Sequence, residues 1–184
     1  MRLTKSSAKS AEALASGWRS RSRPFQNKAA RRYRMARVAF DIHTGLPPER
    51  VMQMLTDFSA HRPDVWPMLA PELYEVHRLG SGSADVKEGS LYPALIWEQD
   101  HYEWSADRVR WTVRDSNYCH PGSYVEVGVR PEADGGTRLQ VEWNRRGVGI
   151  KGKMMIAFVV LTRGAIIRRK VFQRALDRAS AGSE

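Results

Sequence analysis

Alternating apolar and polar residues open the ordered part of the chain. Every second residue from Val38 to Ile42 is apolar, which is the period of a strand with one buried face. Pro47 and Pro48 end this pattern and stand where proline is tolerated, at the start of a helix. Apolar residues then recur at helical spacing over residues 51–58. We therefore predict a strand followed by a short helix, and then a proline-broken second helix or turn.

Strand-like segments in series make up the middle of the chain. Turns rich in Gly, Ser, Asp and Pro separate them. Because parallel strands need long crossovers and these connections are short, we expect antiparallel hairpins. The predicted strands cover residues 72–79, 83–90, 94–104, 108–117, 123–131 and 137–145.

A helical period returns over residues 149–179. Residues 154–161 are apolar on all sides, which predicts a helix buried on most of its surface, with Phe158 and Leu161 in the core. This run is far shorter than the ~20 residues that cross a bilayer. Gly164 is a place where the helix could kink.

The order of elements predicts an α+β fold over residues 36–180. Its most distinctive segments are Val38–Phe58, Trp97–Trp104, Val109–Asn117, Pro121–Ser123, Gly135–Thr137 and the C-terminal helix. In these segments the chain resembles the START-like helix-grip superfamily, in its polyketide cyclase/dehydrase and lipid-transport branch. The resemblance implies a curved antiparallel sheet of six to seven strands, wrapped around a long C-terminal helix and a hydrophobic cavity. The superfamily includes cyclases, aromatases, carriers and ligand sensors, so the fold does not choose among these functions.

The pattern also predicts strand register. If Tyr102 faces Trp111 across a hairpin, Glu98 faces Asp115, and a slip of one residue would mix apolar with polar side chains. The last two strands align in the same way. The predicted inner face then holds Tyr102, Trp104, Val109, Trp111, Val113, Val125, Val127, Val129, Leu139, Val141 and Trp143.

Several polar residues share the inward parity. They are Glu98, Asp100, Asp115, Asn117 and Arg145. One interpretation places them at strand ends, wetted or salt-bridged, because buried charges are costly unless paired. The other makes them convergent polar groups of a ligand site. A Glu98–Asp115 pair would raise one carboxyl pKa by repulsion, although Arg145 could neutralise it.

The predicted inner wall is aromatic. Tyr102, Trp104, Trp111 and Trp143 would line it on the sheet, and Met154 and Phe158 of the long helix would close the other side. These side chains are either core filler or a ligand platform. Together with the inward polar residues they form the predicted ligand-binding set; catalytic residues are not identified.

Net charge is concentrated at the N-terminus. Residues 1–37 hold eleven of the thirty Lys and Arg residues and one acid, which leaves nineteen of each sign elsewhere. We expect residues 1–35 to be a basic, disordered arm, since they cannot bury enough apolar surface to fold. Alternatives are a transit peptide, a segment that docks on nucleic acid or an anionic membrane, or translation that starts at Met35.

Composition excludes several classes of site. The single cysteine, Cys119, rules out an intramolecular disulfide and suits a reducing compartment, so we expect a cytoplasmic protein. Scattered histidines predict no metal site, and neither a phosphate-binding Gly loop nor a nucleophile elbow is present. We therefore expect no cofactor, no dedicated nucleic-acid module and no transmembrane segment.

Three functions remain open. The first is a non-catalytic binder or carrier of a hydrophobic or aromatic small molecule. The second is a cyclase/aromatase-type enzyme that shapes a flexible substrate and moves protons with pocket carboxylates. The third is an interaction protein whose basic arm and basic helix face contact nucleic acid or membrane. The sequence sets neither the ligand nor the oligomeric state.

Overall fold

The computed structural model describes residues 35–182. The predicted arm falls almost wholly outside these residues, so its disorder and its alternatives stay predictions. Within the described range the first strand begins at Ala36. None of the helices there is both long enough and apolar enough to span a membrane.

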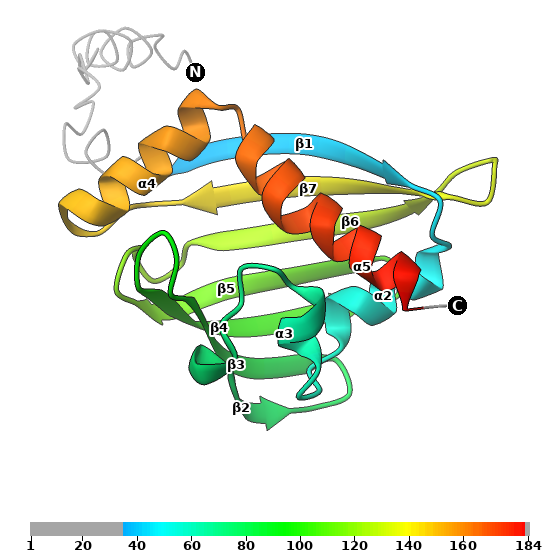
Figure 1. Ribbon diagram of the computed structural model, residues 1–184, viewed down its shortest axis with the longest axis horizontal. Helices are drawn as coiled ribbons and strands as arrows, with labels where there is room; N and C mark the ends of the chain where they lie inside the picture. The colour runs from blue at the N-terminus through cyan, green and yellow to red at the C-terminus, as the bar shows by residue number, and fades with distance from the viewer. Residues whose placement is uncertain (1–34, 183–184) are drawn as a thin grey trace, which may run out of the picture. The chain divides into compact units, whose positions relative to one another are not determined.

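A curved, seven-stranded antiparallel sheet is the centre of the fold (Figure 1). The strand order is β1-β7-β6-β5-β4-β3-β2. From β2 to β7 each strand pairs with the next one in sequence, whereas β1 pairs with β7. The predicted α+β class and the antiparallel sheet are confirmed. The strands are β1 (Ala36–Thr44), β2 (Glu75–Leu79), β3 (Ser83–Ser90), β4 (Ile96–Ser105), β5 (Arg108–Ser116), β6 (Tyr124–Pro131) and β7 (Thr137–Arg145).

Most of the predicted register is confirmed. Tyr102 faces Trp111 between β4 and β5, and Val125 faces Trp143 between β6 and β7. The valines and leucine predicted to share that face are all buried. One face of the sheet is therefore an apolar wall, as the period-two pattern requires.

A β-bulge makes the prediction fail at one end of the β4–β5 hairpin. The register shifts beyond Asp100, so that Glu98 faces Ser116 and Asp115 faces Gln99. The predicted Glu98–Asp115 pair is therefore wrong. Because a bulge places an extra residue in one strand, it turns Asp115 out of the inward parity, and its side chain is exposed.

Three short helical segments connect β1 to β2. They are α2 (Pro48–Thr56), α3 (Arg62–Val65) and the 3-10 turn η1 (Pro71–Leu73), each with proline in its first turn. The apolar face of α2 buries Val51, Met54 and Leu55. The α3 helix matters for the site because it carries Arg62.

The C-terminal helical segment crosses the sheet in two parts (Figure 1). It consists of α4 (Gly149–Leu161), then the π-helical turn η2 (Ile167–Gln173), which continues into α5 (Arg174–Ala181). Arg163 and Gly164 separate the parts, with φ of 49° and 75°. A Cβ atom on Gly164 would lie 2.7 Å from Val38 Cγ1 and 2.8 Å from Phe40 Cδ1, so glycine also permits close contact with β1. The kink predicted at Gly164 is thus a break in the helix.

The predicted burial of α4 is wrong on one side. Ile156 and Val159 are buried, whereas Phe158 is 55% exposed and Leu161 is 81% exposed. A run that is apolar all round contains no period to indicate which face packs, and only one face of α4 meets the rest of the domain. The C-terminal residues that belong to the core are therefore Ile156 and Val159 of α4, together with Phe172, Ala175 and Leu176.

Candidate functional site

A cavity of about 350 Å³ lies between the inner face of the sheet and the C-terminal helical segment. Side chains from α3, β3, β4, β5, β6, β7, α4 and η2 surround it, and most of its wall is apolar. The apolar lining includes Trp66, Leu69, Ile96, Trp97, Trp111, Val125, Trp143, Met155, Ile156, Phe158, Val159 and Phe172.

The structure places part of the predicted ligand-binding set around this cavity. Trp111 stacks on Tyr102 with ring centroids 5.4 Å apart, so the aromatic wall has a fixed shape. The predicted residues that line the cavity are Glu98, Tyr102, Trp111, Trp143, Arg145 and Phe158.

The other members of the predicted set lie elsewhere. Trp104 packs on Phe58, with centroids 5.6 Å apart, and Asp115 is turned outward by the bulge. The Asn117 side chain accepts a hydrogen bond from the Trp97 amide at 2.9 Å, which holds the strand end together.

Met154 also lies away from the cavity. Its side chain is 68% exposed, whereas its neighbour Met155 lines the cavity wall. The prediction selected the wrong methionine because the helix is apolar on both sides.

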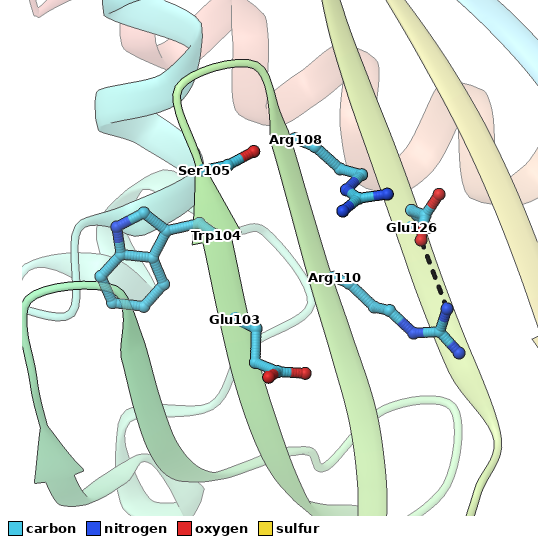
Figure 2. Close-up of a pocket in the computed structure, with 6 residues that line it drawn as sticks. All are labelled: Glu103, Trp104, Ser105, Arg108, Arg110 and Glu126. Carbon is cyan, nitrogen blue, oxygen red and sulfur yellow. Dashed lines mark hydrogen bonds and ion pairs between the residues drawn. The ribbon is translucent and has the colours of Figure 1, made fainter.

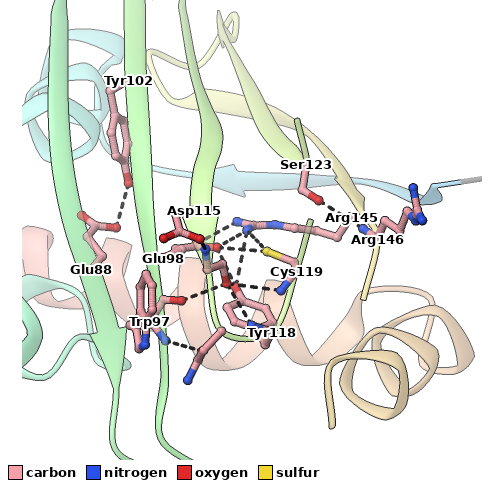
Figure 3. A network of polar contacts seen from close by, with 12 residues as sticks. Glu88, Trp97, Glu98, Tyr102, Asp115, Tyr118, Cys119, Ser123, Arg145 and Arg146 are labelled. Carbon is pink, nitrogen blue, oxygen red and sulfur yellow. Dashed lines mark hydrogen bonds and ion pairs between the residues drawn. The ribbon is translucent and has the colours of Figure 1, made fainter. Parts of the chain in front are cut away.

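A buried polar cluster surrounds Arg145 at one end of the cavity (Figure 3). Glu98 forms a bidentate ion pair with Arg145, with an Nη2–Oε1 distance of 3.0 Å. The Tyr118 hydroxyl donates to Glu98 Oε2 at 2.8 Å, and the Cys119 sulfur lies 3.4 Å from Arg145 Nη1. Since β4, β7 and the β5–β6 loop each supply members, the cluster joins three parts of the chain.

Ion pairing fixes the charge state of this cluster. Burial by itself would raise the pKa of Glu98, but the charge and hydrogen bonds of Arg145 outweigh it and lower that pKa. Burial raises the pKa of the Cys119 thiol, which opposes formation of a nucleophilic thiolate. The cluster is therefore a carboxylate–guanidinium pair and a neutral thiol.

Asp100 is a buried carboxyl group behind this cluster. It is 1% exposed and lies against the Glu98 carboxylate, to which it can donate a hydrogen bond only when it is protonated. Burial and the nearby Glu98 carboxylate raise its pKa well above the usual range of an aspartate. Asp100 does not line the cavity, so it is not a ligand contact in this structure.

A second polar cluster, centred on Arg62, also borders the cavity. Arg62 Nε donates to Glu88 at 2.7 Å, and the Tyr102 hydroxyl donates to the same carboxylate at 2.8 Å. The guanidinium also lies over the rings of Phe58 and Trp66, at 4.6 Å and 5.3 Å from their centroids. Burial opposes its charge, but Glu88 and Tyr102 keep the pKa of Arg62 above its ordinary value.

Sequence reasoning missed Arg62, Glu88 and Tyr118. A signal for Glu88 was present, because it shares the parity of Ala84 and Val86 on β3, which are both buried. Arg62 carried no such signal, since it lies in a short helix where alternation does not apply.

Two buried donors remain without partners at the cavity wall. Trp66 Nε1 and Arg145 Nε have no hydrogen-bond acceptor among the described residues, and both side chains line the cavity. Unsatisfied buried donors are uncommon in folded proteins. Neither nitrogen is accessible to water in this structure, so a ligand atom would reach either donor only after a local shift of the cavity wall.

A second hollow lies over the β4–β5 hairpin and β6 (Figure 2). It has a volume of about 220 Å³, and two of its charged side chains, Arg110 and Glu126, are paired with each other. Arg110 donates to Glu126 at 3.3 Å and lies over the Tyr124 ring at 3.8 Å from the centroid. This hollow is smaller and its lining is mainly polar, so the apolar cavity is the better candidate for a hydrophobic ligand.

The described residues contain no cluster of three or more His, Cys, Asp or Glu side chains placed to hold a metal ion. The polar groups that line the cavity include the paired carboxylates and arginines and the tyrosine hydroxyls.

Sequence comparison and structure comparison give different results. Neither the sequence models of protein families nor the curated protein sequences give a significant match to this chain. The structure is similar to that of a protein from Thermus thermophilus, with a TM-score of 0.65 at 15% identity, covering 80% of this chain and 99% of that one.

Two further solved structures carry informative names. The ZhuI aromatase/cyclase from a Streptomyces species has a TM-score of 0.65 at 12% identity, covering 79% of this chain and 94% of its own. A START superfamily protein from Mycobacterium smegmatis has a TM-score of 0.56 at 14% identity, covering 74% and 97%. At these identities the likeness establishes the fold alone. The chain has the START-like helix-grip fold.

Proposed function

We propose that this protein binds a hydrophobic or amphipathic small molecule in the cavity between the sheet and the C-terminal helical segment. The observation that carries the proposal is the apolar cavity of about 350 Å³. Small-molecule sites are usually apolar clefts of about 300–1,000 Å³ with a few polar groups. The volume thus suits a small ligand with the polarity of a lipid or an aromatic polyketide.

Most polar groups at the cavity are already paired with one another and would not form ion pairs with the ligand. Glu98 and Glu88 are each paired with an arginine, so they offer no unpaired carboxylate to the cavity. The unpartnered donors Trp66 Nε1 and Arg145 Nε are buried in the wall and are not exposed to the cavity. We therefore expect the part of the ligand inside the cavity to be mainly apolar and uncharged.

An aromatase/cyclase-type activity is the second candidate, supported by the aromatase/cyclase among the structural neighbours. The electrostatics favour binding over acid–base catalysis. Glu98 has a lowered pKa and a bidentate partner, which makes it a weak general acid and a weak general base. Burial raises the pKa values of Tyr102 and Tyr118, which keeps their hydroxyl groups protonated.

The binding test compares adjacent methionines in α4. Met155→Trp places a larger side chain at the cavity wall, and Met154→Trp makes the same change on the exposed side. A hydrophobic fluorescent probe is titrated into the wild type and both variants. We expect about tenfold weaker binding by Met155→Trp only, a loss of about 1.4 kcal/mol.

Native mass spectrometry of protein purified without delipidation gives an independent result. A retained mass would identify the ligand class, and its recovery unchanged after incubation would separate a binder from an enzyme. If the folded wild type binds no hydrophobic probe at micromolar concentration, or if both tryptophan variants bind it equally, the cavity is not the binding site.

A further inference from the structure

The outer face of α4 is an exposed apolar stripe. Ile150, Met154, Phe158 and Leu161 are 80%, 68%, 55% and 81% exposed. Their spacing of four, four and three residues places them along one side of the helix. The opposite side is fixed to the protein, since a Cβ atom on Gly152 would meet the Tyr118 carbonyl oxygen at 1.9 Å. The stripe is therefore held outward by tight packing on the other face.

The β3–β4 loop extends this apolar surface. Leu91, Tyr92 and Leu95 are 54%, 82% and 50% exposed. Lys151 Nζ donates to the Leu95 carbonyl oxygen, which places the loop beside the first turn of α4. We call the α4 stripe and the three loop residues the mouth surface. Single exposed apolar residues are ordinary, but seven large ones on neighbouring segments indicate an interaction site.

The segments that carry the mouth surface contain charged residues of one sign only. Residues 149–176 contain seven Lys and Arg residues and no Asp or Glu, and residues 89–97 contain no charged residue. The basic side chains at 151, 153, 163, 169 and 170 are exposed. Apolar side chains flanked by lysine and arginine are typical of segments that lie in the interface of an anionic bilayer.

The mouth surface also borders the cavity. Phe158 belongs to the stripe and lines the cavity, and Pro93 of the loop and Lys170 of η2 line it from the other sides. A molecule that leaves the cavity past Phe158 would emerge at this surface. An apolar ligand would then pass between protein and bilayer without crossing water.

We propose that the mouth surface docks on an anionic phospholipid membrane, with the α4 stripe and the β3–β4 loop inserted among the lipids. A second copy of the chain fits less well. In a two-fold symmetric contact each residue faces the same patch of its partner, so basic side chains would meet basic side chains without an acid between them. The inference does not depend on ligand binding in the cavity. Membrane docking is measured with no ligand present, and binding of the fluorescent probe is measured with no vesicles present, so either can fail alone.

Residues 1–37 carry eleven Lys and Arg residues, which would also attract anionic vesicles. The test therefore uses the full chain for every variant, so that this attraction is the same in all of them. Flotation compares phosphatidylcholine vesicles with vesicles that also contain phosphatidylglycerol. The triple variant Ile150→Gln, Met154→Gln, Leu161→Gln retains the arm and every basic residue. The control is Leu79→Gln, since Leu79 is a 61% exposed apolar residue at the end of β2.

We expect the wild type and Leu79→Gln to bind the anionic vesicles, and the triple variant to bind about tenfold or more weakly. A second measurement locates the contact. Leu161→Cys and Leu79→Cys are labelled with an environment-sensitive dye, while Cys119 is protected by full burial. Vesicles should shift the emission of the dye to the blue at position 161 only.

Four results would overturn the proposal. They are absence of wild-type binding, equal binding by the triple variant, binding that is independent of phosphatidylglycerol, and an unshifted dye at position 161. Light scattering on the vesicle-free protein adds one more. A wild-type dimer that the triple substitution dissociates would assign the mouth surface to a second copy instead.

Discussion

Substitution of Glu98 by glutamine would leave Arg145 buried without its counter-charge. The Glu98 carboxylate accepts hydrogen bonds from both terminal nitrogens of Arg145 and from the Tyr118 hydroxyl. Arg145 is 3% exposed, so bulk water replaces the lost partner poorly. Breaking a buried ion pair by removing one partner costs about 3–5 kcal/mol. Because glutamine can still accept one of these bonds, we expect a loss near the lower end, about 3 kcal/mol in the free energy of unfolding.

Asp115→Asn is the matched control. Its side chain is exposed, and it accepts a hydrogen bond from the backbone amide of Ser116 at 2.8 Å. We expect a change within about 0.5 kcal/mol, as for most surface substitutions. Sequence pattern alone would treat the two carboxylates as equivalent members of one inward pair, so the comparison tests the bulge directly.

The effect of pH has a defined sign. The pKa of Glu98 is lower in the folded protein than in the unfolded chain, so its stabilisation is fully present above the unfolded value, about 4.3. That stabilisation is lost as the pH falls toward the folded pKa. The difference between wild type and Glu98→Gln should therefore be largest near neutral pH and should shrink in acid.

Urea unfolding curves of the wild type and both variants, recorded at neutral and acidic pH, measure these differences. The reasoning is refuted if Glu98→Gln costs less than about 1 kcal/mol at neutral pH, or if Asp115→Asn costs as much as Glu98→Gln.

Other substitutions test the remaining features of the fold. Phe172→Ala should cost about 3–5 kcal/mol in urea unfolding, since Phe172 is 1% exposed, whereas Leu161→Ala should cost under about 0.5 kcal/mol; equal costs would contradict the assigned face of α4. Asp100→Asn should raise the free energy of unfolding by about 1–3 kcal/mol at neutral pH, because the buried carboxyl lies against Glu98 and has a raised pKa, whereas the amide is neutral. That gain should disappear below the unfolded pKa, and a loss of stability at neutral pH would show that the carboxyl has a needed partner. A chain that begins at Met35 should melt at the same temperature as the full chain, and a drop of more than a few degrees would show that the preceding residues pack on the domain.

The sheet could be predicted because burial on one face imposes a period of two. A register error of one residue would have placed Tyr102 and Trp111 in water, so the pattern left few alternatives. The bulge beyond Asp100 could not be predicted in the same way. It shifts only the polar end of the hairpin, around Glu98 and Asp115. No apolar residue would be exposed by a different register there, so the sequence does not indicate which register forms.

The packing of α4 could not be predicted because its apolar residues surround the helix. Period indicates a buried face only when the other face is polar. Gly152 was the available sign, since glycine in a helix marks a close approach, here to the Tyr118 carbonyl. From Gly152, Ile156 and Val159 follow at helical spacing on the buried side.

The charges around the cavity follow from pairing between distant elements. Arg62 of α3 pairs with Glu88 of β3, and Arg145 of β7 pairs with Glu98 of β4. Each pair adds no net charge to the cavity wall, which leaves Lys170 at the mouth as the unbalanced lining charge among the described residues. A fully charged ligand group deep in the cavity would have to replace one member of such an ion pair. The displaced member would then be buried without a counter-charge, at a cost of several kcal/mol. We therefore expect the ligand to be uncharged along its buried length, and any acidic group it carries to lie at the mouth beside Lys170.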